Sequence, residues 1–142
     1  MGAFRWRRRS TRYFCEVWVP YAEIRLRRSD GAYQPFAMQI DSGAVISLLR
    51  RSIADLLGVP LEGGQRVEMS AVVGGEVTAF RHDLEFRVGD GTLTFRAPFA
   101  IAEREDVPNL LGRLGIFDAL QIEFDPRLKE TRISAPRLEA TT

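Results

Sequence analysis

The chain has 142 residues, enough for one domain with a single hydrophobic core and too few for two comfortable ones. Hydrophobic residues make up 45% and charged residues 27%, a globular balance that excludes a mainly disordered chain. The net charge of +1 gives the average surface no particular attraction for acidic partners.

Basic residues gather at the N-terminus, where the first twelve positions include Arg5, Arg7, Arg8, Arg9 and Arg12. Such a run can contact nucleic acid or anionic lipid. Short basic termini are more often frayed and solvated. We therefore interpret residues 1–12 as a solvated tail and keep nucleic-acid contact as the alternative.

The chain's single cysteine and single histidine argue against several kinds of site. Cys15 cannot form an intrachain disulfide and lies in an apolar stretch, which predicts a buried thiol. His82 stands in a strand-like run, where we expect an exposed or hydrogen-bonded ring. One cysteine and one histidine do not fill a zinc site, so we predict no metal and no cofactor. No apolar run is long enough to span a bilayer, and Glu16 and Glu23 interrupt the only signal-like segment, which predicts a cytoplasmic protein without membrane contact.

Alternation of apolar and polar residues with a period of two predicts strands along most of the chain. In chain order, the predicted elements are strands near 22–26 and 36–40, an apolar run at 45–49, a helix over 51–57, strands at 67–73, 77–88 and 93–97, a second short helix within 112–120, and closing strands at 121–124 and 131–133. These elements indicate an all-β domain over residues 13–134, with a closed or sandwich-like sheet and one or two short helices. Residues 135–142 are predicted to form a loose C-terminal tail.

An acidic residue directly follows one of the predicted buried strands. Asp41 is followed by Ser42 and Gly43, a glycine that permits a tight turn and brings an N–H group close to the carboxylate. Asp-Ser-Gly alone is a common turn sequence. Here apolar residues stand on both sides of the loop, which places it over the core rather than at a polar surface and favours a catalytic role.

Two further segments are compatible with the same interpretation. Gly74 and Gly75 lie at the tip of a predicted hairpin, which makes a flexible arm with backbone groups open to a ligand, although an ordinary glycine turn fits equally well. The segment 109–113 (Asn-Leu-Leu-Gly-Arg) is an apolar pair followed by a glycine, a pattern that simple strand-to-helix packing also explains.

Taken in order, the segment 40–44 (Ile-Asp-Ser-Gly-Ala), the Gly-Gly hairpin and the segment 109–113 resemble the retropepsin-type aspartic proteases, which are the retroviral proteases and their free-standing cellular and bacterial relatives. The resemblance extends from Tyr21 to Ile133, and it implies an aspartic endopeptidase with a β-hairpin flap. The site residues that it implies are Asp41, Ser42 and Gly43 for catalysis, Ala44, Val73, Gly74 and Gly75 for substrate binding, and Leu110, Leu111, Gly112 and Arg113 for support of the site.

The chemistry of this family requires two carboxylates that share one proton. The protonated carboxyl polarises the scissile carbonyl, while its ionised partner activates a water. Asp41 lies in the only Asp-Ser/Thr-Gly of the chain, so the second carboxylate is predicted to come from a second copy in a homodimer. The resemblance further implies that Ser42 grips the partner's loop, that Gly43 donates its N–H to the carboxylate, and that a peptide or protein substrate lies extended beneath the flaps.

Two other functions remain open from the sequence. One is a catalytically silent binding module with the same fold, and the other is an adaptor that contacts nucleic acid through the arginine-rich start. Asp41→Asn separates the first from a protease, because binding would survive the substitution. Deletion of residues 1–12 tests the second, because salt-sensitive nucleic-acid binding would disappear with them.

Overall fold

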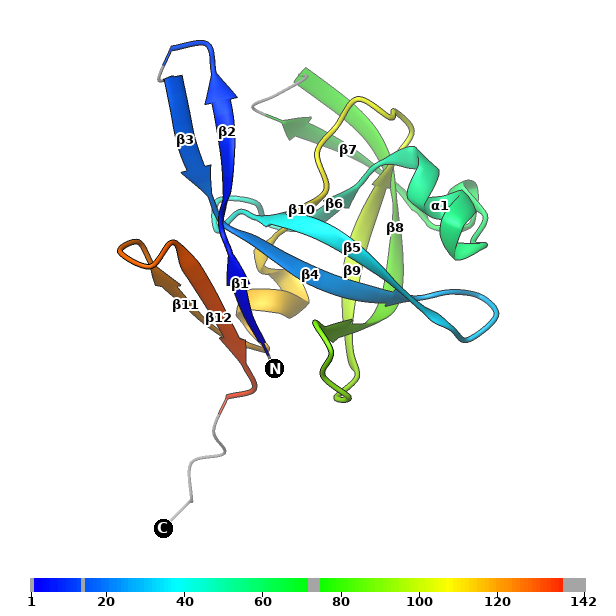
Figure 1. Ribbon diagram of the computed structural model, residues 1–142. Coiled ribbons are helices and arrows are strands. Elements are labelled where there is room, and N and C mark those ends of the chain that lie inside the picture. The colour runs from blue at the N-terminus through cyan, green and yellow to red at the C-terminus, as the bar shows by residue number, and fades with distance from the viewer. Residues whose placement is uncertain (1, 14, 72–74, 137–142) are drawn as a thin grey trace.

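The computed structural model of the chain describes residues 2–13, 15–71 and 75–136, and it consists mainly of β-strands (Figure 1). In chain order the elements are β1 (Gly2–Arg5), β2 (Arg7–Thr11), β3 (Cys15–Val19), β4 (Tyr21–Arg27), β5 (Tyr33–Ile40), β6 (Ser47–Leu49), α1 (Arg51–Leu57), η1 (Leu61–Gly63), β7 (Gln65–Ala71), β8 (Gly75–Val88), β9 (Phe95–Ala102), β10 (Leu110–Leu111), η2 (Arg113–Phe117), β11 (Gln121–Asp125) and β12 (Glu130–Ser134). The predicted all-β class is confirmed.

Six strands close into a barrel. Their order is β4-β5-β10-β6-β9-β8, and the ring closes because β8 also pairs with β4. Strand β7 adds to β8 outside this ring. The β5–β10 and β6–β9 pairs are parallel, whereas the other pairs in the ring are antiparallel. Because β10 enters between β5 and β6, the residues that follow β5 and β10 meet at one end of the barrel.

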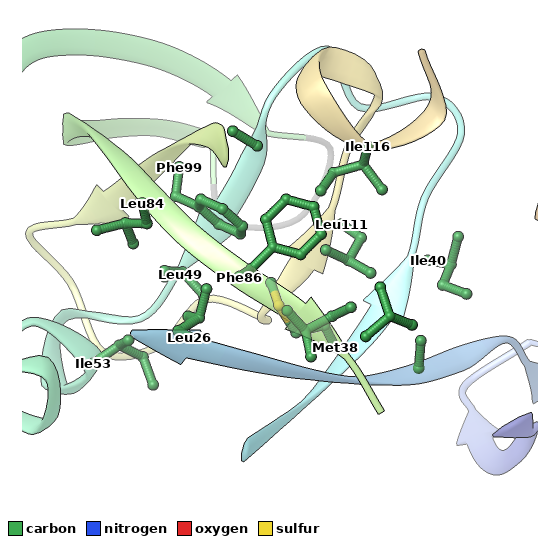
Figure 2. Close-up of a cluster of buried hydrophobic side chains, with 14 of the residues drawn as sticks. Leu26, Met38, Ile40, Leu49, Ile53, Leu84, Phe86, Phe99, Leu111 and Ile116 are labelled. Atoms are coloured by element: carbon green, nitrogen blue, oxygen red, sulfur yellow. The ribbon is translucent and has the colours of Figure 1, made fainter. Parts of the chain in front are cut away.

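The period-two alternation of the sequence fills the barrel interior. On β4, Ile24 and Leu26 are fully buried, while the arginines between and after them point outward. Figure 2 shows side chains from several strands pointing toward one another around Phe86 of β8 and Phe99 of β9. The rings of these two phenylalanines meet edge to face with centroids 6.1 Å apart. Each such buried side chain stabilises the fold by about 1.5–3 kcal/mol, so the barrel is a rigid support for its loops.

Helix α1 begins and ends as the sequence predicts. Gly58 follows its last residue with φ of 70°, the left-handed conformation that ends helices and favours glycine. At the other end, the Ser52 N–H and hydroxyl both donate to Glu105, over 2.8 and 2.7 Å. The N-cap residue of the helix makes no side-chain hydrogen bond of its own, so a carboxylate from a distant loop caps the helix instead.

Glu105→Gln is expected to lower stability in a pH-dependent manner. The hydrogen bonds from the Ser52 side chain and backbone hold the pKa of Glu105 below its usual value of 4.5. The stabilisation from the ionised carboxylate is therefore complete above about pH 4.5 and is lost as the pH falls through the lowered pKa. Urea unfolding of both proteins should show a stability gap at pH 7 that closes in strong acid, and a pH-independent gap would contradict the capping role.

The N-terminal residues differ from the frayed tail that we expected. Strand β1 pairs with β12 in a three-stranded sheet, β1-β12-β11, and β2 pairs with β3 in a hairpin that projects from the barrel (Figure 1). Between β1 and β2, the Trp6 Nε1–H donates to the buried Thr131 hydroxyl over 2.8 Å. The expectation of a frayed tail is therefore wrong for residues 2–11, although most β2 side chains are solvent-exposed.

Two other local predictions also need correction. Cys15 is exposed at the start of β3 with φ of 57°, so the predicted buried thiol is wrong. The predicted helix within 112–120 shortens to η2, where Leu114 (ψ 120°) and Gly115 (φ 74°) are not helical.

The closing strands are present as β11 and β12. In the described part of the chain, none of the helices has the length and apolar character needed to cross a membrane.

Candidate active site

Asp41 stands at the end of the barrel where β5 and β10 stop together. Its N–H donates to the carbonyl of Leu111, the last residue of β10, over 2.9 Å. This bond extends the parallel β5–β10 pairing by one step beyond Ile40. The backbone of Asp41 is therefore fixed by two strands, and its side chain leaves the barrel at a defined point.

The Asp41 loop is organised around the carboxylate. Gly43 N–H donates to Asp41 Oδ1 over 2.9 Å, and Ala44 N–H donates to the Asp41 carbonyl over 3.2 Å. Asp41 is half-buried, whereas Ser42 and Gly43 are exposed. Within the described residues, Oδ2 of Asp41 has no hydrogen-bond partner. One oxygen is thus held in place while the other is open to a proton, a water or a second carboxylate.

The segment that follows β10 holds this loop from the other side. Arg113 N–H donates to the Ala44 carbonyl and Leu114 N–H donates to the Val45 carbonyl, both over 2.9 Å. Gly112 is buried next to them, and a Cβ at that position would lie 2.5 Å from the carbonyl carbon of Ile46. Glycine is therefore required there by close backbone approach rather than by its dihedral angles. The structure brings the predicted supporting residues 110–113 against the Asp41 loop.

Ser47 belongs to the same region, although the sequence did not single it out. It is fully buried at the start of β6, and its hydroxyl accepts the Gly112 N–H over 2.9 Å. The sequence does place a hydroxyl residue inside the apolar run 45–49, and this could have indicated Ser47, because a buried polar side chain needs a hydrogen-bond partner. The partner itself lies 65 positions away in sequence, beyond the reach of local patterns.

Ser47→Ala is expected to destabilise the protein by about 1–3 kcal/mol, because it leaves the buried Gly112 N–H without an acceptor. Thermal or urea unfolding measures the loss. Ser134→Ala is the matched control, since that serine is exposed on β12 and should change stability by less than about 0.5 kcal/mol. Equal effects of the two substitutions would contradict a structural role for the Ser47 hydroxyl.

The hairpin predicted as a flap is formed by β7 and β8, whose pairing runs from Gln65↔Arg81 to Ala71↔Gly75. Gly75 has φ of 70° and nothing within 4 Å of the position of a Cβ. Val73 and Gly74, which we expected to contact substrate, lie outside the described residues. The function of this hairpin as a flap stays a prediction.

Large apolar side chains are exposed next to the Asp41 loop. Val45 is 57% exposed and Leu114 is 41% exposed, and the two residues are joined by the backbone hydrogen bond described above. The site thus presents an apolar surface beside a carboxylate with one open oxygen. Such a surface is better suited to contact with another chain than to bulk water.

His82, the only histidine, is half-buried, and one of its ring nitrogens lies 2.9 Å from the Leu61 carbonyl oxygen. This agrees with the predicted hydrogen-bonded histidine. Across residues 2–13, 15–71 and 75–136, no three side chains of His, Cys, Asp or Glu gather in a way that could hold a metal ion.

Comparison with known proteins defines the class. A family model described as aspartyl protease matches residues 25–114, well over half of the chain. The chain therefore belongs to the aspartyl protease family, and it is an aspartic endopeptidase. The matched segment includes both the Asp41 loop and the Gly112 segment.

One solved structure places the fold within that class. A retropepsin-like aspartic protease from Rickettsia conorii is similar with a TM-score of 0.57 and 14% identity, over 94% of this chain and 99% of that one. The EIAV protease complexed with the inhibitor HBY-793 matches with a TM-score of 0.46 and 21% identity, over 67% of this chain and 82% of that one. A comparison with curated proteins gave no significant match. The fold is that of the retropepsin-like proteases, as the sequence motifs indicated.

Proposed function

We propose that this endopeptidase hydrolyses peptide bonds through a water held between two Asp41 carboxylates, one from each subunit of a homodimer. The observation that carries the proposal is the state of Asp41, whose Oδ1 is fixed by Gly43 while Oδ2 has no partner among the described residues. One carboxyl of the pair stays protonated and polarises the scissile carbonyl, because like charges at short distance cannot both ionise easily. The other removes a proton from the water as it attacks, and the shared proton then passes to the leaving amine.

A second copy is needed because the sequence contains one Asp-Ser/Thr-Gly. A twofold axis beside the Asp41 loop would bring two identical loops face to face. Two features of the loop support this arrangement. The Ser42 side chain is exposed and has no partner within the described residues, so it is available to hold the partner's loop. Val45 and Leu114 are apolar and exposed at the same place, and a dimer would cover them.

The substrate is proposed to lie extended across the two loops and under the β7–β8 hairpin. Gly43 and Ala44 of the Asp41 loop would form the floor of the groove, while the β7–β8 hairpin, with the predicted contact residues Val73, Gly74 and Gly75, would form its cover. A strand-like substrate suits such a groove because its backbone can pair with both sides. Closure of the hairpin over it would exclude water from the reaction.

A peptidase assay with the purified chain tests the proposal, combined with sedimentation to measure its oligomeric state. We expect cleavage that pepstatin inhibits, a dimer at working concentration, and an activity optimum on the acidic side of neutral, because the dyad must retain one proton. A flat activity profile from about pH 4 to pH 9 would count against a shared proton.

The cytoplasmic location is part of the same proposal, since a lone cysteine gives no sign of an oxidising compartment.

A further inference from the structure

A pocket of about 300 Å³ lies between the β2–β3 hairpin and the barrel. The residues that line it include Arg7, Arg9, Tyr21, Ala37, Arg50 and Asn109. Three arginines from two distant segments thus face one pocket, and no carboxylate is among the described lining residues. The pocket therefore has a concentrated positive charge in a protein whose net charge is only +1.

Successive side chains of β2 point to opposite faces of the strand, which explains which arginines reach this pocket. Arg7 and Arg9 lie on one face of the strand, with Arg7 stacked 4.9 Å from the Tyr21 ring centroid and Arg9 Nη1 donating to Gln39 Oε1 over 3.2 Å. Arg8 points to the other face and forms an ion pair with Glu16 at 3.1 Å. Among the described residues, neither Arg7 nor Arg9 forms an ion pair, so both bring an uncompensated positive charge to the pocket.

Arg50, which lies between β6 and α1, is the third arginine of the pocket lining. Its Nε donates to the Val107 carbonyl over 2.8 Å, which positions the guanidinium without neutralising it. Glu105 attracts Arg50 electrostatically, but this carboxylate lies outside the pocket lining and both of its oxygens accept hydrogen bonds from Ser52. The direct contacts of the three guanidinium groups within the described residues are therefore with neutral partners, and each group retains N–H donors for an anion.

The pocket is close to the proposed catalytic loop. Ala37 lies on β5 and precedes Asp41, the first residue after that strand, by four positions, which corresponds to roughly 13 Å at the usual rise per residue. Asn109, which also lines the pocket, directly precedes β10, whose last carbonyl accepts the Asp41 N–H. An extended peptide covers this distance in about four residues.

We propose that this arginine pocket binds an acidic side chain of the peptide substrate, about four residues from the cleaved bond. The inference rests on the proposed function, because it takes a peptide as the ligand. The planar guanidinium fork matches a carboxylate with two parallel hydrogen bonds, and such charge-assisted bonds are stronger than neutral ones. The ligand would also relieve the repulsion among three like charges.

The pocket favours an acidic peptide over a nucleic acid. Binding of single-stranded nucleic acid depends on exposed aromatic rings that stack with bases. The Tyr21 ring, the aromatic residue of the described pocket lining, is already covered by the Arg7 guanidinium, and the exposed Tyr13 and Trp18 of the β2–β3 hairpin are not part of that lining. On the other face of β2, Arg8 is paired with Glu16, which breaks the continuous basic stripe that a phosphate backbone follows.

Binding can be measured without cleavage by using Asp41→Asn protein as the background. The probes are a short fluorescent Glu-rich peptide, its twin with Gln in place of each Glu, and a single-stranded RNA oligonucleotide. We expect the Glu peptide to bind more tightly than its twin, and Arg9→Gln or Arg50→Gln to weaken it about ten-fold each. Arg8→Gln is the matched control, because it removes the same charge from the other face of β2 and should leave binding nearly unchanged.

Three results would overturn the proposal: equal binding of the Glu and Gln peptides, equal losses from Arg8→Gln and Arg9→Gln, or RNA that binds more tightly than the Glu peptide through the same arginines. Melting temperatures of the variants show that each is folded. Cleavage of both peptides by the unsubstituted protein separates this inference from the proposed function. If the function is wrong, neither peptide is cut although the Glu peptide still binds; if only the pocket is wrong, both are cut equally well.

Discussion

Asp41→Asn is expected to abolish peptide hydrolysis and leave the fold unchanged. Asparagine has the same shape and still accepts the Gly43 N–H at Oδ1, so the loop keeps its conformation. It cannot act as a general base or share a proton, and loss of such a group lowers rates by about 10²–10⁴-fold or more. Initial cleavage rates of a peptide substrate measure the loss, and circular dichroism with thermal melting measures the fold.

Asp30→Asn provides the matched control for this substitution. Asp30 Oδ1 accepts the Ala32 N–H over 2.9 Å, the same two-residue turn geometry as at Asp41, but it lies in the β4–β5 turn. We expect this variant to retain nearly full activity. Substantial hydrolysis by folded Asp41→Asn, or an equal loss in the control, would remove Asp41 from the mechanism.

Gly112→Ala is expected to destabilise the protein strongly, because the added methyl group has no space. The new Cβ would lie 2.5 Å from the Ile46 carbonyl carbon and 2.6 Å from its oxygen, and neither backbone atom can move without opening the Asp41 loop. We expect a loss of about 3 kcal/mol, at the upper end for overpacking. For a chain of this size that corresponds to a melting temperature about 10 °C lower.

Gly31→Ala separates this steric effect from the general cost of replacing glycine. Gly31 has φ of 90°, and the nearest atom to its Cβ position is Arg27 Nη2 at 3.9 Å. Its replacement should cost only the strain of the left-handed conformation, about 1–2 kcal/mol. If Gly112→Ala is no more destabilising than this control, the close packing of the two loop segments is not as described.

Local sequence signals were sufficient for much of the fold and for the Asp41 loop. The alternation of β4 and β8 marks strands with one buried face, and Gly58 marks the end of α1. Asp41 could be singled out because a turn chosen only for its conformation seldom stands between two apolar segments. These features depend on residues within a few positions of one another, which is why the sequence alone reveals them.

Features that depend on distant partners could not be predicted. Strand β2 contains three successive arginines and no apolar residue, so no alternation marks it, and it forms by backbone pairing with β3. The Ser47–Gly112 bond joins residues 65 positions apart. The arginine pocket likewise requires Arg50 to line the same cavity as Arg7 and Arg9, which stand more than 40 positions earlier in the sequence. Each is a product of the closed topology rather than of a local pattern.

A single catalytic pair built from the Asp41 of two chains can be tested by mixing active and inactive subunits. Equal amounts of the unsubstituted chain and Asp41→Asn are refolded together, and activity is expressed per active subunit. A shared site predicts that this activity falls to about half, because random pairing places half of the active subunits opposite an inactive partner. Undiminished activity per active subunit would show that each chain cleaves peptides on its own.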